Sequence, residues 1–272
     1  MEVNWLRCLR DMDALFEQTE IAFAEGRQAA QVPVLDARAE MISVTGDPWR
    51  EALWQCWEGF LRVITQGYPE HAMIYCHKAL AIAERKNLEE LRAFAECCTA
   101  QIHLIAGNLL AGQLAGIRAL ATFEARGNIP WACRALWMLS ALTNAMERWE
   151  ESLDYCRRAL VHAQIVAHTR LTVVGTWRTG STLILSGDPV AGLQWCAQAL
   201  ALSPQPLDVM TITAVQGNGL LRSGKIDEGI ARLETAMAWF KERILWHDYS
   251  VFGMHLGEGY VQRGERLLAH TL

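Results

Sequence analysis

A frame of small residues recurs along this chain with a period of about 40 residues. Its anchor is a glycine in all but one copy, at Gly67, Gly107, Glu147, Gly187, Gly224 and Gly264. Five positions after the anchor stands another small residue: Ala72, Gly112, Ser152, Gly192 and Gly229. Self-similarity of this length predicts a repeat protein, in which each copy buries its apolar face against its neighbours.

The frame predicts that each copy is a pair of helices joined by a tight turn. Around Gly67, residues 49–66 predict helix A and residues 70–86 predict helix B. Pro69 lies between them, and proline is favoured in the first turn of a helix. Small residues seven before and five after the anchor let the two helices approach closely. Because no segment alternates like a β-strand, the predicted fold class is all-α.

Three positions depart from the frame, and we expect looser packing there. Glu147 replaces the turn glycine, Phe60 occupies the small position before the Gly67 anchor, and Leu233 replaces an aromatic residue or cysteine. Projected outwards, the frame predicts a first A helix at about 4–25, a first B helix at about 28–44 and a last A helix at about 245–263. The predicted organisation is therefore a degenerate pair over 1–46, five to six repeats over 47–264, and a truncated last helix over 265–272.

The pattern resembles the tetratricopeptide repeat (TPR) family over roughly residues 48–264. The shared features are a small residue in mid-helix A, glycine at the turn, and Ala-Leu late in helix B, as in Ala79-Leu80 and Ala199-Leu200. The usual period is 34 residues; a period near 40 is similar to the longer variety in MalT-like regulators and other bacterial signalling proteins, including Rap-type peptide receptors. The resemblance implies an α-solenoid of antiparallel helix pairs, a right-handed superhelix with A helices on its concave wall.

Composition excludes several classes of function. The net charge of −5 and the lack of a Lys/Arg-rich run argue against a nucleic-acid partner. No apolar run approaches the roughly 18 residues of a membrane span, and the first residues lack the apolar core of a signal peptide. We therefore expect a cytoplasmic protein with no membrane partner.

The residues that could carry chemistry fit packing better. Cys76, Cys156 and Cys196 recur at one place in helix B, where a cysteine behaves as a small buried hydrophobe. Residues 219–225 match a phosphate loop only superficially, because Ile226 stands where Ser or Thr should hold magnesium. The eight histidines show no metal-ligand or catalytic spacing. We expect no catalytic residue, no metal and no cofactor.

The family resemblance implies that groove-facing positions lie thirteen, ten, six and three residues before each anchor. Aromatic residues and one arginine dominate the first two positions, and amides and hydroxyls occur deeper. The predicted binding residues are Trp54, Trp57, Phe94, Gln101, Arg134, Trp137, Asn144, Trp177, Ser181 and Asn218. Trp and Arg carry much of the energy of interfaces. The alternative, that the tryptophans pack on one another as core, stays open.

These residues predict a non-catalytic module that binds a peptide, a protein segment or a small apolar ligand, as the sensory or scaffold part of a signalling or transcription-regulating protein. Trp57, Trp137 and Trp177 would be anchors, and Arg134 would pair with a carboxylate. One alternative is a homodimer through the uncovered last repeat. Another is an enzyme or cofactor-binding protein with a site around Cys97 and His103 inside the helical shell.

Overall fold

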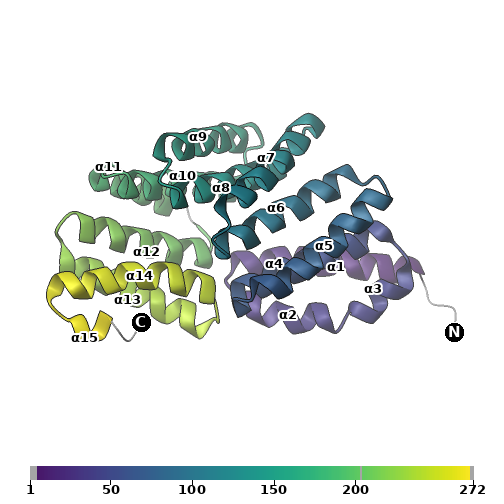
Figure 1. The fold of residues 1–272 in the computed structure, drawn as a ribbon, viewed down its shortest axis with the longest axis horizontal. Coiled ribbons are helices and arrows are strands. Elements are labelled where there is room, and N and C mark those ends of the chain that lie inside the picture. The colour runs from purple at the N-terminus through teal and green to yellow at the C-terminus, as the bar shows by residue number, and fades with distance from the viewer. Residues whose placement is uncertain (1–4, 203, 270–272) are drawn as a thin grey trace. The chain divides into compact units, whose positions relative to one another are not determined.

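The computed structural model describes residues 5–202 and 204–269, and every regular element in those ranges is an α-helix. The chain divides into two compact units, unit 1 (Met1–Asn128) and unit 2 (Ile129–Leu272). Unit 1 contains α1 (Trp5–Ala24), α2 (Gln28–Asp36), α3 (Ala39–Thr45), α4 (Pro48–Gln66), α5 (Pro69–Arg85), α6 (Glu89–Ile105) and α7 (Leu109–Arg126) (Figure 1). Unit 2 contains α8 (Ile129–Ala145), α9 (Trp149–Ile165), α10 (Thr169–Leu185), α11 (Pro189–Ala201), α12 (Pro206–Arg222), α13 (Ile226–Glu242), α14 (Trp246–Arg263) and α15 (Arg266–Ala269).

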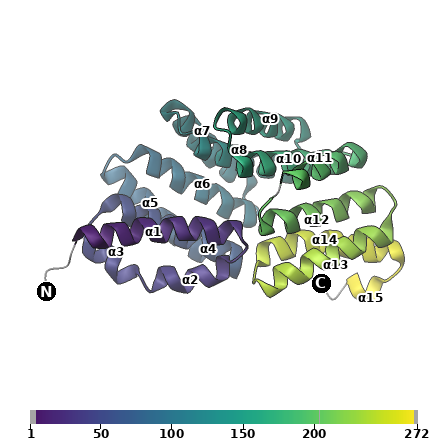
Figure 2. The same cartoon turned by 180° about the vertical axis from the view of Figure 1, so that it is seen from behind.

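The predicted helix pairs are present in both units. In unit 1 they are α4 with α5 and α6 with α7; in unit 2 they are α8 with α9, α10 with α11 and α12 with α13, each packed closely along its length (Figure 1). The first helix B, expected as one helix over about 28–44, is instead α2 and α3, which both pack on α1 (Figure 2). The chain turns at Ala37–Arg38, where the Arg38 N–H donates to Leu35 O over 3.0 Å with the tighter three-residue spacing.

A residue in the left-handed region ends most of the helices. The anchors Gly67, Gly107, Gly187, Gly224 and Gly264 all have positive φ, and so does Glu147 at 58°. The backbone N–H of the residue after the anchor commonly donates to the carbonyl oxygen five residues earlier in the helix. Asn108 N, for example, donates to His103 O over 2.9 Å. This bond is one of the two that define a Schellman motif, for which glycine is favoured. The predicted turn glycines are therefore required by backbone conformation.

Replacing Glu147 by glycine is expected to stabilise the protein by about 1 kcal/mol, because a residue with a Cβ is strained at positive φ. The gain is measured as a rise in the free energy of unfolding in urea. The matched control is Gly107→Glu, since a Cβ at Gly107 would meet nothing within 4 Å and only backbone strain is added. That variant should lose a similar amount; equal stability of all three proteins would contradict the assignment.

The small positions of the frame are the points where helices A and B cross. A Cβ on Gly180 of α10 would lie 2.7 Å from Gly192 O of α11. In α4 the equivalent contact is made by Gly59, whose Cβ would lie 2.8 Å from Ala72 O, so the apparent exception at Phe60 is a shift of one residue. One residue corresponds to about 100° around a helix. Trp54 and Trp57 therefore point in directions different from those of Trp137 and Trp177.

Candidate functional site

The A helices form the inner layer of each unit. In unit 2, α8 contacts α10, α10 contacts α12 and α12 contacts α14, whereas α9, α11 and α13 make at most marginal contact with one another. In unit 1, α4 contacts α6 in the same way. Because the A helices are closer together than the B helices, each stack curves with its A helices on the concave side. The inner layer of unit 2, defined as α8, α10, α12 and α14, holds six of the ten predicted residues.

The predicted aromatic residues of unit 1 are largely core. Trp57 is 3% exposed and packs edge-on against Phe60 and Phe94, with ring centres 5.9 and 6.0 Å away. The Trp54 indole N–H donates to Leu35 O at the end of α2 over 3.2 Å, so its polar atom is already satisfied. Gln101 on α6 is also buried. In this unit the structure places the predicted aromatic residues in packing contacts.

The two predicted tryptophans of unit 2 are different. Trp137 on α8 packs against a buried cluster that includes Cys133 and Leu171, yet it is only half-buried. Trp177 on α10 is also half-buried. Each has an indole Nε1 that water cannot reach and that has no hydrogen-bond acceptor. An indole N–H usually finds an acceptor when buried, so both side chains have an unused donor on the inner layer.

The predicted polar residues of unit 2 have mixed roles. The Arg134 guanidinium lies over the Trp131 ring, 4.2 Å from its centre. Asn144 Nδ2 donates to Thr182 Oγ1 over 3.0 Å and links α8 to α10. Asn218 on α12 is buried and accepts from Arg222 Nε over 3.1 Å. Ser181 is half-buried on α10. Asn144 and Asn218 thus support the inner layer through contacts within unit 2.

Sequence reasoning missed a charged group beside the predicted tryptophan on α10. The Arg178 guanidinium carbon lies 4.8 Å from the Trp177 ring centre. Its Nε is inaccessible to water and has no acceptor. One signal in the sequence could have revealed it: Arg178 stands nine residues before its anchor, where the two adjacent copies carry the apolar residues Met138 and Val215.

Two carboxylates on other inner-layer helices, Asp208 on α12 and Asp248 on α14, interact electrostatically with Arg178. Asp208 at the start of α12 is buried and accepts from Arg170 Nε over 3.3 Å. Asp248 lies at the start of α14. Burial raises the pKa of both carboxyl groups above the ordinary value, and Arg178 partly opposes that shift in each. Burial also lowers the pKa of the His247 imidazole.

The cysteines support the packing interpretation. Burial raises the pKa of Cys196 to about 12 and that of Cys133 to about 11, so these thiols stay protonated and are poor nucleophiles. Burial likewise raises the pKa of Cys56 and of Cys76, well above the ordinary value for Cys76. In the described ranges no group of three or more His, Cys, Asp or Glu side chains is arranged to hold a metal ion.

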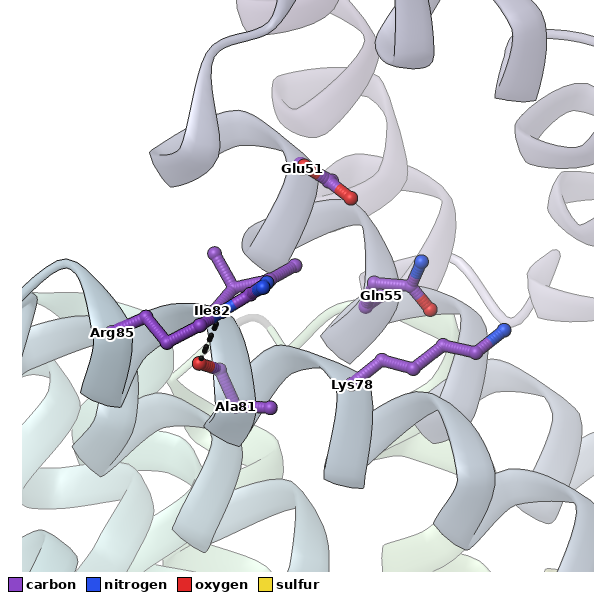
Figure 3. A pocket seen from close by; sticks show the side chains of 6 residues that line it. All are labelled: Glu51, Gln55, Lys78, Ala81, Ile82 and Arg85. Carbon is purple, nitrogen blue, oxygen red and sulfur yellow. Dashed lines mark hydrogen bonds between the residues drawn. The ribbon is translucent and has the colours of Figure 1, made fainter.

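Two surface cavities are lined by residues other than the ten predicted binding residues. A cavity of about 330 Å³ between α4 and α5 is lined by Glu51, Gln55, Lys78, Ala81, Ile82 and Arg85 (Figure 3). None of the ten predicted residues lines it. An open cavity of about 790 Å³ lies along α14 and reaches Ala269, beside the exposed side chains of Met254 and Val261. At the centre of the alternative enzyme site, Cys97 is buried, and burial lowers the pKa of His103.

Comparison with known proteins identifies the fold. No protein-family model and no curated protein matches this sequence. Among solved structures, NprR in complex with its cognate peptide NprX matches with a TM-score of 0.74 at 12% identity, over 100% of this chain and 78% of that one. A Rap protein complexed with competence and sporulation factor matches with a TM-score of 0.72 at 11% identity, over 100% of this chain and 85% of that one.

A third solved structure, aspartyl phosphate phosphatase F from Bacillus subtilis, matches with a TM-score of 0.70 at 14% identity, over 98% of this chain and 69% of that one. Likeness at such low identity defines the fold alone. The prediction of an all-α, TPR-like solenoid of helix pairs is confirmed. In the described part of the chain, none of the helices has both the length and the apolar character needed to cross a bilayer.

Proposed function

We propose that this chain is a non-catalytic, TPR-like regulatory module that binds a peptide or an extended protein segment on the inner layer of unit 2. The observation that carries the proposal is the pair of unsatisfied indole donors of Trp137 and Trp177. Both rings are half-exposed, and on binding they would turn to present these N–H groups to backbone carbonyls of the bound segment. A purely apolar ligand offers no acceptor, so the donors favour a peptide over the small apolar ligand of the sequence-based prediction.

The fold likeness supports the same proposal. Of the similar structures, NprR was crystallised with its cognate peptide NprX, and a Rap protein with competence and sporulation factor. The third is named as an aspartyl phosphate phosphatase. The protonated cysteines on the present chain favour a binding role over catalysis. The proposed role is therefore recognition, in a signalling protein.

Trp177→Phe is expected to weaken peptide binding about fivefold, because phenylalanine keeps an aromatic ring and loses one hydrogen bond of about 1 kcal/mol. The measurement uses a library of random octapeptides, size-exclusion separation of the complexes, and mass spectrometry of the peptides retained. Trp137→Phe should have a similar effect.

The matched control is Trp57→Phe, since Trp57 is buried in the core of unit 1 and should leave retention unchanged. If no peptide is retained by the folded wild-type protein, the proposed function is wrong. Light scattering on the same samples tests the alternative of self-association through the exposed apolar side chains of α14. A molar mass that rises from that of one chain to that of two as the protein concentration increases, while no peptide binds, would favour that alternative.

A further inference from the structure

Arg178 is an arginine without a partner on the inner layer of unit 2. The side chain is half-buried, and among the described residues it makes no hydrogen bond or ion pair. Its recorded contact is the face of the Trp177 ring, which fixes the guanidinium beside an indole whose own N–H lacks an acceptor. Moving a charged group out of water without a partner costs several kcal/mol, so such groups are rare unless they serve a function.

Three other half-buried arginines have carboxylate partners. Arg50 pairs with Asp13 and Asp47, and Arg62 pairs with Glu58 and Asp36. Within unit 2, Arg170 stands eight residues before Arg178 on the same helix and pairs with Asp208 at 3.3 Å. Each of these three half-buried arginines thus has a carboxylate within ion-pair distance. Among the described residues Arg178 has none, at a position that faces the inner layer.

The charges around Arg178 leave its own charge only partly compensated. Burial lowers the pKa of the guanidinium, while Cys156, Asp248 and Asp208 oppose that shift. Asp208 is already held by Arg170, and His247 adds no positive charge near neutral pH because burial lowers its pKa. An arginine stays protonated at any physiological pH. The site therefore presents a fixed positive charge.

Three unsatisfied buried atoms of α8 and α10 are donors: Trp177 Nε1 and Arg178 Nε on α10, and Trp137 Nε1 on α8. The Asn144 amide oxygen on α8 is an unsatisfied acceptor. A group that complements the three donors must accept several hydrogen bonds, and the arginine favours one that carries negative charge. A planar carboxylate meets both conditions, because it can accept two parallel bonds from a guanidinium.

We propose that Arg178 is the recognition residue for a carboxylate of the bound segment, so that the module selects peptides with an acidic group. This inference rests on the proposed peptide-binding function and adds the chemistry of the ligand. We assign the role of carboxylate partner to Arg178 in place of Arg134, because Arg178 has a buried donor without an acceptor among the described residues and Arg134 is not among the side chains with such an atom. The Trp177 ring holds the guanidinium in place, and its N–H supplies a further donor.

The test compares three pools of otherwise random octapeptides. The first pool carries one fixed aspartate and has acetylated and amidated ends. The second carries asparagine in its place with the same ends. The third carries the asparagine and has a free terminal carboxylate. We expect the wild-type protein to retain at least one carboxylate-bearing pool about tenfold better than the second, the size expected for hydrogen bonds to a charged group. The first and third pools distinguish a side-chain from a terminal carboxylate.

Arg178→Gln should abolish this preference, whereas Arg134→Gln, the matched control on α8, should keep it. Equal retention of all pools by the wild-type protein would overturn the Arg178 proposal and leave peptide binding intact. Retention of no pool would overturn both proposals. Arg178→Leu adds a readout independent of any ligand: its midpoint of thermal unfolding should rise by a few degrees, because an unpaired charge is removed. A fall would indicate that Arg178 serves to stabilise the fold and would count against a recognition role.

Discussion

Gly192→Val should destabilise unit 2 by about 3 kcal/mol, the upper end of the usual cost of overpacking. Helices α10 and α11 cross with Gly180 facing Gly192. A Cβ on Gly192 would lie 2.5 Å from the carbonyl oxygen of Gly180 and 2.5 Å from Ile184 Cγ1. A backbone oxygen cannot rotate away, so the two helices must separate. Urea unfolding followed by tryptophan fluorescence measures the loss.

Gly253→Ala is the control, because Gly253 also lies in the interior of a helix of unit 2, in α14. A Cβ there would meet only the terminal Cε of Met237, at 3.3 Å, and that atom can move. We expect this variant to keep or gain stability, by up to about 1 kcal/mol, since alanine favours helix over glycine. Similar losses in both variants would show that helix crossing is not the reason for the small residue.

Glu58 is the origin of the second large effect, a dependence of stability on pH. Its side chain is fully buried on α4 and receives a hydrogen bond from Arg62 Nε over 2.8 Å. Burial raises the pKa of the carboxyl to about 7; Arg62 opposes the shift and Asp36 adds to it. In the unfolded chain the pKa of a glutamate is about 4.3. Between these values the folded state holds a proton that the unfolded state has lost.

The contribution of Glu58 to the free energy of unfolding should therefore fall as the pH rises from about 4.5 to 7, by about 3 kcal/mol in total. Glu58→Gln removes the titration, so this variant should be more stable than the wild type at pH 8 and nearly equal to it at pH 4.5. Urea unfolding across this range gives the difference. Asp36→Asn, at an exposed partner of the same arginine, should keep most of the wild-type slope, because burial is the largest cause of the shift and Asp36 a smaller one. Parallel curves for wild type and Glu58→Gln would rule out the raised pKa.

Much of the fold could be predicted from the spacing of small residues. The anchors predicted the turns because a left-handed residue is needed at each helix end, and Glu147 adopts that conformation even without being glycine. The Gly59 crossing was assigned one residue late, because α4 reaches its turn with one extra residue after the crossing point. The offset changes the direction of Trp57 and explains why it is buried while Trp177 is not.

The candidate site was harder to predict. Trp137 and Trp177 were identified from their register, but the sequence could not show that their N–H groups would lack acceptors. Arg178 was overlooked because its register position is apolar in the two adjacent copies, and only the folded structure shows that its Nε has no acceptor among the described residues. Asn144 was assigned to the groove, whereas the structure bonds it to Thr182 on the next inner-layer helix.

The sequence by itself determined the helix pairs, their period and the all-α class, because these depend on local backbone preferences and on the close approach of small residues. The tertiary structure decided which repeated positions are core and which present unused donors, because that depends on side chains from neighbouring repeats. Trp57 finds an aromatic neighbour in Phe94. Arg178 Nε finds no acceptor among the described residues, and this unsatisfied donor makes Arg178 a candidate for recognising a ligand.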